Sequence, residues 1–251
     1  MRIALLHSGP EGRFARLDDQ RAFLLSAAPW LGGRETGESR DWTIADLACP
    51  VRPTKIVGIG RNYAAHAREL GHEIPTEPLL FLKAPSALAG PGDAIALPPE
   101  SARVEHEAEL AVVVGKRAKN VARADALGHV FGYACACDVT ARDLQRKDVQ
   151  FARAKSFDGF CPIGPWIETE LAPLDLSVAC RVDGVVRQDG STSQMIFSVP
   201  ELVSFVSRMM TLEPGDVILT GTPEGVGPIA AGNAVEVAIA GIGTLAFRVA
   251  G

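Results

Sequence analysis

Short apolar runs, separated by turns rich in glycine and proline, recur along the chain and predict many strands. The runs that read as strands are residues 55–58, 107–114, 132–138, 176–182, 216–220, 234–240 and 244–249. Four segments fit helices better, namely 18–31, 64–70, 122–130 and 200–210. Because helices and strands do not alternate regularly, a doubly wound parallel sheet is not expected. We predict a β-rich α+β fold with mixed, mostly antiparallel sheets.

Three glutamates stand at alternate positions in VEHEAELAVVVGK (104–116), directly before an apolar run. On a strand, Glu105, Glu107 and Glu109 would share one face, with Cα atoms about 6.6 Å apart. Like charges so placed repel unless something neutralises them. A solvated face is the ordinary interpretation, whereas the adjoining apolar residues favour a bound cation. Carboxylate ligands would select a hard ion such as Mg²⁺, Mn²⁺ or Ca²⁺.

A further carboxylate, Asp138, follows the apolar run GYACAC (132–137), and Arg142, Asp143 and Gln145 come soon after it. These residues could form one edge of a site. Asp138 could equally cap the next helix, and the residues alone favour the cap.

The composition of the chain argues against nucleic-acid-binding, secreted and membrane-spanning proteins. The 251 residues carry a formal net charge of −5 and are 47% hydrophobic, which is ordinary for a globular protein. Basic residues are scattered, so we expect no nucleic-acid partner. The first apolar run, residues 3–6, is too short for a signal peptide, and no run is long enough for a membrane span. We therefore expect a cytoplasmic protein without a membrane partner.

The cysteines and several familiar motifs exclude other classes. The five cysteines show no C-x-x-C spacing, so we expect buried thiols rather than disulfides or a zinc site. Tyr63 stands where a dinucleotide-binding fingerprint needs its third glycine. The chain has no G-x-S-x-G elbow and no H-E-x-x-H motif.

Seven stretches together resemble the fumarylacetoacetate hydrolase family, in the order that this family shows. They are KIVGIGRNYAAHARE (55–69), PLLFLKAPSALAGPGDAIALP (78–98), VEHEAELAVVVGK (104–116), GYACACDVTARDLQ (132–145), RAKSFDGFCPIGPW (153–166), RQDGSTSQMIF (187–197) and LEPGDVILTGTPEGVGP (212–228). The resemblance implies a mixed β-roll over residues 51–251, with a small N-terminal appendage over 1–50. It also implies a homodimer.

The resemblance assigns a metal site to Glu107, Glu109 and Asp138, with Mg²⁺ or Mn²⁺ as the ion, and leaves Glu105 outside it. Some family members add a fourth carboxylate in the stretch that matches GRNY. Here Arg61 and Asn62 occupy that stretch, so water or substrate should complete the coordination.

The same resemblance implies catalytic and substrate-binding residues. His66 and Glu69 match the catalytic pair, and a helix would bring positions i and i+3 to one face. The alternative is a surface histidine on an amphipathic helix. Lys155 would stabilise an oxyanion. The substrate-binding residues implied are Arg142, Gln145 and Thr222. Lys83 matches a recurrent lysine of the family more weakly.

The reaction that the resemblance implies proceeds through an enolate of a small 2-oxo or 2-hydroxydienoic acid, stabilised by the cation. Only nine residues separate Gln145 from Lys155, which resembles isomerases and decarboxylases of aromatic catabolism such as 2-hydroxyhepta-2,4-diene-1,7-dioate isomerase. The alternatives are acylpyruvate hydrolysis, oxaloacetate decarboxylation, and a non-catalytic β-rich module with a structural cation.

Overall fold

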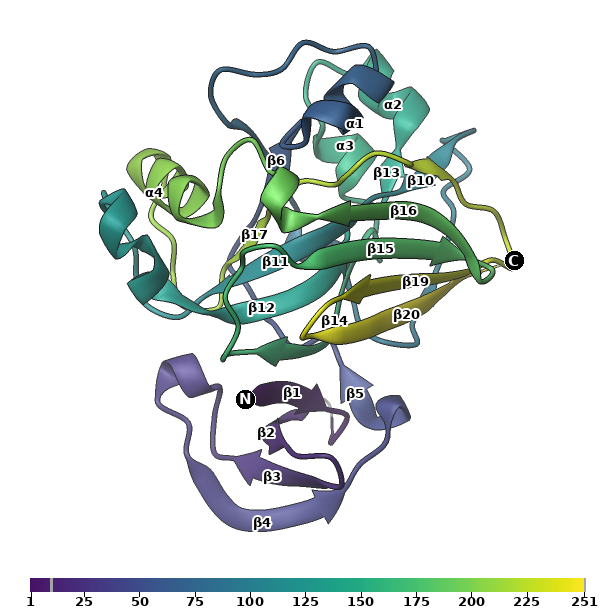
Figure 1. The fold of residues 1–251 in the computed structure, drawn as a ribbon. Helices are drawn as coiled ribbons and strands as arrows, with labels where there is room; N and C mark the ends of the chain where they lie inside the picture. The colour runs from purple at the N-terminus through teal and green to yellow at the C-terminus, as the bar shows by residue number, and fades with distance from the viewer. Residues whose placement is uncertain (10, 251) are drawn as a thin grey trace.

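Three sheets organise the computed structural model, which describes residues 1–9 and 11–250 (Figure 1). The largest runs in the order β4-β3-β2-β1-β14-β12-β11-β17-β6-β7, with β5 beside β1 and β8 beside β14. Its strands are β1 (Arg2–Leu6), β2 (Arg13–Leu17), β3 (Arg21–Leu25), β4 (Glu35–Asp41), β5 (Leu47–Ala48), β6 (Ile56–Gly60), β7 (Leu79–Lys83), β8 (Leu88–Ala89), β11 (Ala108–Val114), β12 (Val130–Cys137), β14 (Cys161–Glu168) and β17 (Val217–Leu219).

Two smaller sheets complete the fold. One runs β16-β15-β19-β20-β9 and contains β16 (Val185–Ser191), β15 (Ser177–Val182), β19 (Ala234–Ile239), β20 (Gly243–Val249) and β9 (Ala94–Ile95). The other runs β13-β10-β18 and contains β13 (Thr140–Ala141), β10 (Val104–His106) and β18 (Gly227–Pro228). Only the pairs β17–β6, β8–β14 and β9–β20 are parallel among the described strands. The predicted β-rich, mostly antiparallel fold is confirmed, and its sheets are open.

The helices are short and few. They are α1 (Ala64–Glu69), α2 (Arg142–Lys147), α3 (Ala152–Lys155) and α4 (Val199–Met209), with 3₁₀ turns η1 (Pro29–Leu31), η2 (Ile44–Asp46), η3 (Pro85–Ala87), η4 (Arg123–His129) and η5 (Thr192–Gln194). Among the described residues, none of them combines the length and the apolar character that crossing a bilayer requires.

The helix predicted over 18–31 is wrong. The Asp18 carboxylate accepts hydrogen bonds from the backbone N–H groups of Gln20 (2.9 Å) and Arg21 (2.6 Å), which closes a tight turn between β2 and β3. The helix predicted over 122–130 is the 3₁₀ turn η4, and Val130 already belongs to β12. The predicted helices at 64–70 and 200–210 are confirmed as α1 and α4, with ends within one residue.

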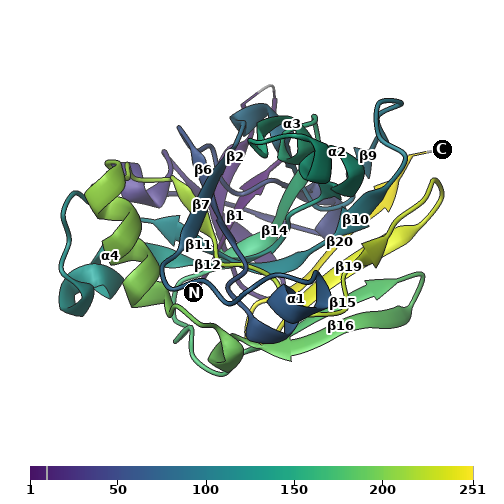
Figure 2. The same ribbon diagram turned by 90° about the horizontal axis from the view of Figure 1, so that it is seen from above.

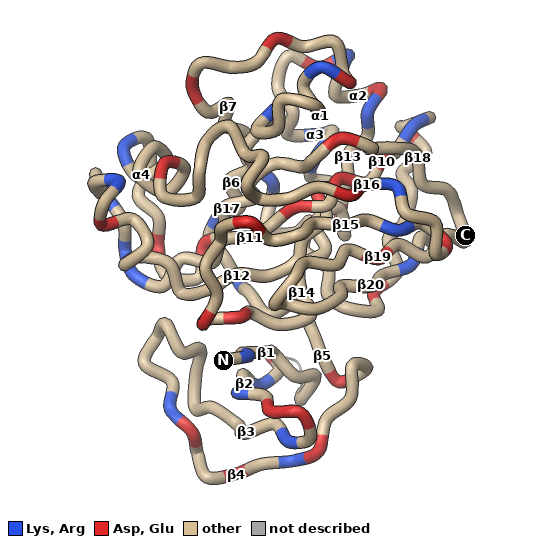
Figure 3. Tube along the Cα trace, viewed as in Figure 1, with Lys and Arg blue, Asp and Glu red and all other residues tan. Residues whose placement is uncertain are grey.

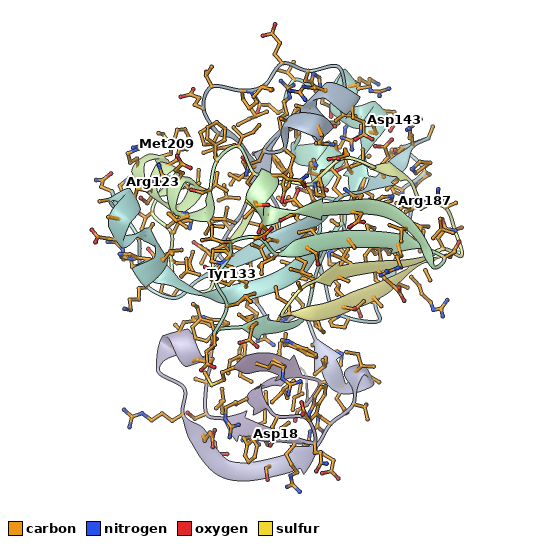
Figure 4. The ribbon with its side chains drawn as sticks, in the orientation of Figure 1. Asp18, Arg123, Tyr133, Asp143, Arg187 and Met209 are labelled. Atoms are coloured by element: carbon orange, nitrogen blue, oxygen red, sulfur yellow. The ribbon has the colours of Figure 1, made fainter. Side chains whose placement is uncertain are left out.

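The main core lies between the centre of the large sheet and the five-stranded sheet, where side chains fill the space between the layers (Figure 4). A second apolar cluster belongs to the N-terminal strands, with Ala4, Leu6, Ala15, Leu17, Ala22, Leu24 and Leu47. Strand β1 pairs with β14, so the N-terminal strands extend the large sheet. The domain division at residue 50 stays a prediction. All five cysteines are free, and four are buried.

Helices α1, α2 and α3 gather at the end of the molecule opposite the N-terminal strands (Figure 1). Seen from above, α1 lies on one side and α2 and α3 lie on the other, with β10 between them (Figure 2). The predicted site residues come from these helices and from the strand ends beneath them.

Candidate active site

Glu107, Glu109 and Asp138 form a buried acidic triad, in which one carboxylate oxygen from each residue lies within 4.8 Å of the others. The pairing of β11 with β12 produces this arrangement, because Ala108 stands opposite Cys137 and all three acids adjoin that pair. The backbone N–H of Asp138 donates to the carbonyl oxygen of Glu107 (2.8 Å). Asp138 therefore closes a site and does not cap a helix.

Two buried lysines compensate part of the triad's charge. Lys155 donates from Nζ to Glu107 Oε2 (2.8 Å) and to Asp138 Oδ2 (2.6 Å). Lys83 donates to Asp138 Oδ1 (2.6 Å). The resemblance had assigned Lys83 only weakly, and its place beside Asp138 shows that it supports the acidic site.

Glu105 is buried like the other two glutamates, but it lies outside the triad. The gap at Glu107 separates β10 from β11, so the three acids do not lie on one continuous strand. Arg142 joins them instead: its Nε donates to Glu105 Oε2 (2.6 Å), and its Nη2 donates to Glu107 Oε1. Glu105 therefore holds Arg142 in place. A row of acids needs a neutralising charge, and the Arg142 guanidinium group supplies it at Glu105 and Glu107.

The acids respond differently to their surroundings. Burial would raise the pKa of Glu107, but Lys155 and Arg142 hold that pKa well below its usual range. Burial raises the pKa of Glu109, and the nearby Asp138 and Glu107 carboxylates raise it further. The only hydrogen bond to the Glu109 side chain within the described residues comes from the backbone N–H of Gly221 (2.6 Å). Glu109 is therefore the member of the triad that no basic side chain pairs with among the described residues.

These residues fit a hard divalent cation. Three carboxylates supply oxygen ligands only, and their ligand atoms converge. Burial disfavours the ionised form of Glu109, and a bound cation would stabilise that form. Binding of such an ion would require Glu109 to release its proton, because a carboxylate ligand must be ionised.

His66 and Glu69 lie on α1 above the triad. His66 Nδ1 is 3.2 Å from Glu69 Oε2, as the i, i+3 spacing predicted. Because the carboxylate can only accept, Nδ1 carries the proton and Nε2 is left as the basic atom. Glu69 Oε1 also accepts from the backbone N–H of Gly225 (3.0 Å), which ties α1 to the loop of residues 220–226.

A cavity of about 300 Å³ brings the predicted residues together. Its lining includes His66, Glu107, Glu109, Asp138, Arg142, Gln145, Lys155 and Thr222. Glu69 contacts His66 but does not line the cavity. Gln145 Oε1 accepts from Arg142 Nη1 (2.6 Å). Helix α2 is anchored from behind by Asp143, labelled in Figure 4, which accepts from Ser101 Oγ (2.6 Å) and Ala102 N (2.9 Å).

The Thr222 hydroxyl already has protein partners. It donates to the carbonyl oxygen of Ala108 (2.8 Å) and accepts from Gln188 Nε2 (2.7 Å). Its backbone N–H has no hydrogen-bond partner within residues 1–9 and 11–250. The group that Thr222 offers to a ligand is therefore this N–H.

Gln188 is a residue that the sequence analysis missed. Besides Thr222, its amide group donates to the carbonyl oxygen of Pro223 (2.8 Å). Its Oε1 accepts from the backbone N–H of Ala108 (3.0 Å) and faces His106 Nδ1 at 3.0 Å. Gln188 belongs to the matching stretch RQDGSTSQMIF, and that membership was the one sign of its importance in the sequence. The sequence does not show that its side chain reaches Ala108, 80 positions away.

Comparison with known proteins identifies the relatives of this arrangement. The model of the fumarylacetoacetate (FAA) hydrolase C-terminal family matches residues 55–250. The structure of 5-carboxymethyl-2-hydroxymuconate delta-isomerase from Mycobacterium smegmatis superposes with a TM-score of 0.92 at 42% identity, covering 100% of this chain and 99% of that one.

Two further relatives extend the range of reactions. Mitochondrial oxaloacetate tautomerase FAHD2A of Bos taurus is 50% identical over 186 residues, which are 72% of this chain and 59% of that protein. Fumarylpyruvate hydrolase from Pseudomonas aeruginosa, solved in complex with Mn²⁺ and pyruvate, has a TM-score of 0.75 at 37% identity. That alignment covers 80% of this chain and 91% of the hydrolase.

Proposed function

The chain belongs to the fumarylacetoacetate hydrolase family, and from this premise we propose that it is a divalent-metal-dependent isomerase or decarboxylase. Its substrates are small 2-oxo or 2-hydroxydienoic acids, of the kind that 2-hydroxyhepta-2,4-diene-1,7-dioate represents, and the shared intermediate is an enolate. The observation that carries the proposal is the meeting of the acidic triad and the His66–Glu69 pair in one cavity.

Glu107, Glu109 and Asp138 would hold the cation, which we propose to be Mg²⁺ or Mn²⁺. When bound, such an ion supplies Lewis-acid chemistry that binds a 2-oxo acid and favours its enolate over its keto form. The Mn²⁺ and pyruvate in the related fumarylpyruvate hydrolase support this choice of ion and substrate class.

The chain's own side chains perform the proton transfer. His66 Nε2 takes a proton from carbon 3 of the 2-oxo acid, and the electron pair of that C–H bond moves into the enolate. Glu69 orients the ring and stabilises the imidazolium that forms. Return of the proton at a different carbon gives the isomer. In decarboxylation, loss of CO₂ from carbon 3 leaves the electron pair of the broken C–C bond in an enolate that is one carboxylate shorter. His66, which takes up a proton from solvent at Nε2, then protonates carbon 3 and completes the product.

Other groups position the substrate. The Lys155 ammonium lies beside the triad, where negative charge develops on the enolate oxygen. The Thr222 backbone N–H is available for the substrate carboxylate, and Arg142 and Gln145 form the adjacent wall.

Acylpyruvate hydrolysis is the second candidate. A histidine oriented by a carboxylate can also activate water for attack on a distal carbonyl, and a fumarylpyruvate hydrolase is among the relatives. The isomerase aligns over more of this chain than that hydrolase does, and the oxaloacetate tautomerase is more similar in sequence than either. Both observations favour proton transfer. We also propose a role in aromatic catabolism, a cytoplasmic location and a homodimeric state.

The test is a turnover assay of metal-stripped protein with Mg²⁺, with Mn²⁺ and with EDTA. The substrates are oxaloacetate, 2-hydroxyhepta-2,4-diene-1,7-dioate and acetylpyruvate, followed by absorbance of the enol or dienol and by NMR of the products. We expect metal-dependent isomerisation or CO₂ release, reduced about 10²- to 10⁴-fold by His66→Asn and abolished by Glu107→Gln. His7→Asn is the matched control, because His7 is exposed and does not line the cavity.

The products decide between the candidates. Pyruvate and acetate from acetylpyruvate, without turnover of the other two substrates, would replace the proposal by hydrolysis. Tight metal binding without turnover of any substrate would favour the non-catalytic module with a structural cation.

A further inference from the structure

The cavity has an acidic floor and a basic mouth. The floor is formed by the triad, whose three residues are at most 4% exposed. Arg61, which is half-buried, and Arg146 and His72, which are exposed, line the same cavity. Solvent exposure therefore increases from the triad at the floor of the cavity to these basic side chains at its mouth. In Figure 3, segments of both charges lie at the end of the trace that carries α1 and α2, so the basic character is a property of the cavity lining and not of that whole end.

The guanidinium groups of Arg61 and Arg146 have no hydrogen bond or ion pair within residues 1–9 and 11–250. Arg142, deeper in the same cavity, donates to three protein side chains. The pKa of His72, which lines the same cavity, responds to these charges. Burial lowers this pKa, and the positive charges of Arg61, His66, Arg142 and Arg146 lower it further. Among the residues that the structure describes, no carboxylate lies within ion-pair distance of either guanidinium group at the mouth.

The backbone of Arg61 is fixed in a conformation that side-chain-bearing residues rarely adopt. Its φ is 58°, in the left-handed region. The next residue, Asn62, is fully buried and clamps this turn: its amide group donates to Thr220 O (2.7 Å) and Phe197 O (3.0 Å) and accepts from Phe197 N (2.8 Å). Such strain persists where surrounding structure enforces it, as at ligand sites. Arg61 is therefore held at the cavity wall.

Apolar side chains line the cavity together with these two charged groups. They include Leu79, Phe81 and Phe151. The Phe81 ring lies 4.9 Å from Lys155 Nζ at the floor and packs edge-on against Phe151 at 6.0 Å. The floor suits a 2-oxo acid group, the apolar walls suit a carbon chain, and the basic mouth suits a second carboxylate. The cavity as a whole therefore suits a carbon chain with a carboxylate at each end.

We propose that Arg61 and Arg146 bind the distal carboxylate of the substrate and make the enzyme selective for dicarboxylic 2-oxo acids. Two guanidinium groups can together donate several charge-assisted hydrogen bonds to one carboxylate. This inference rests on the proposed function, because the floor must hold the 2-oxo acid for the mouth to meet its other end.

Binding of an unreactive pair of probes tests the inference without turnover. 2-Oxoglutarate and 2-oxopentanoate have the same chain length and the same 2-oxo acid end, and only the first has a distal carboxylate. Calorimetric titration of Mn²⁺-loaded protein should show 2-oxoglutarate binding about 10- to 100-fold more tightly. Arg61→Leu and Arg146→Leu should each weaken 2-oxoglutarate about tenfold and leave 2-oxopentanoate within twofold.

Matched controls remove one positive charge each from the helices near the cavity. Arg68→Leu on α1 and Lys147→Leu on α2 alter exposed residues outside the cavity lining, and both affinities should stay unchanged. Equal affinity of the wild type for the two probes, or a preference that survives in the Arg61→Leu/Arg146→Leu double variant, would overturn the inference while the proposed function stands. Binding of neither probe would reject the proposed function itself, and the inference with it.

Discussion

Replacing Lys155 with methionine is expected to unbalance the buried charges of the acidic site. Lys155 is only 2% exposed, and its ammonium group bridges Glu107 and Asp138 at 2.8 and 2.6 Å. Methionine keeps much of the side-chain volume and removes the charge. The two carboxylates would each lose a charge-assisted hydrogen bond and stay buried, because β11 and β12 fix their position.

The expected loss follows from the cost of leaving a buried charge unpaired. Removing one partner of a buried ion pair costs about 3–5 kcal/mol, and Arg142 and Lys83 still contact Glu107 and Asp138, so the lower half of that range is expected. A divalent cation replaces the missing charge. At a free metal concentration 100 times Kd, binding adds about 2.7 kcal/mol to the free energy of unfolding. That gain should exceed the wild-type gain at the same metal concentration, since Lys155 no longer competes for the two carboxylates.

The assay is urea unfolding of wild type and Lys155→Met in EDTA and in saturating Mn²⁺, followed by circular dichroism. Lys147→Met, which is exposed on α2, should stay within about 0.5 kcal/mol of wild type. Glu109→Gln is the opposite perturbation: it removes the carboxylate whose pKa burial raises, so EDTA-treated protein should keep its stability while the Mn²⁺ effect disappears. A Lys155→Met variant as stable as wild type in EDTA would refute the charge-balance reasoning.

Three other substitutions give separate readouts. Glu69→Gln keeps an acceptor for His66 Nδ1 but cannot stabilise the imidazolium, so kcat should fall about 10²-fold with little change in KM, measured by steady-state kinetics. Gln188→Leu leaves two buried donors unpaired and should lower the free energy of unfolding by about 2–6 kcal/mol in urea, whereas an unchanged value would contradict this network. Glu201 closes a capping box with Ser198 at the start of α4, and hydrogen bonds from Ser198 lower its pKa. Since the folded-state pKa lies below the unfolded one, this stabilisation is present above about pH 4.5 and is lost as pH falls. Glu201→Gln should therefore destabilise the protein in urea at pH 7 and make progressively less difference below pH 4.5.

The parts of the site that follow from local pattern were predictable. The i, i+3 spacing placed His66 beside Glu69, and the apolar runs located β11 and β12. Only the resemblance brought Asp138 to the glutamates, because the residues alone favoured a helix cap. The resemblance excluded Glu105 from the triad, and its burial against Arg142 gives the physical reason. The predictions made from local pattern depend on neighbours along a strand or helix, whose geometry is nearly fixed.

The parts that depend on distant contacts were not predictable from pattern. Arg142 was expected to meet the substrate, but its hydrogen bonds to Glu105, Glu107 and Gln145 make it first a structural partner of the acids. In the N-terminal region, residues 18–31 have a composition that suits a helix. The Asp18 turn and the pairing of β3 with β2 and β4 override that local preference.

The buried charges of the site alternate in sign, and this alternation explains why the triad is stable and still suited to a cation. Each neighbour in the series carries the opposite charge and is hydrogen-bonded to the next: Glu105, Arg142, Glu107, Lys155, Asp138 and Lys83. The series contains equal numbers of acids and bases, so the attraction between its members offsets much of the cost of removing them from water. Glu109 stands outside the series, with only the Gly221 N–H as a hydrogen-bond partner among the described residues. Glu109 lies beside two carboxylates that lysines already orient, so it is the group that a cation would pair with, while the paired series is balanced without the ion.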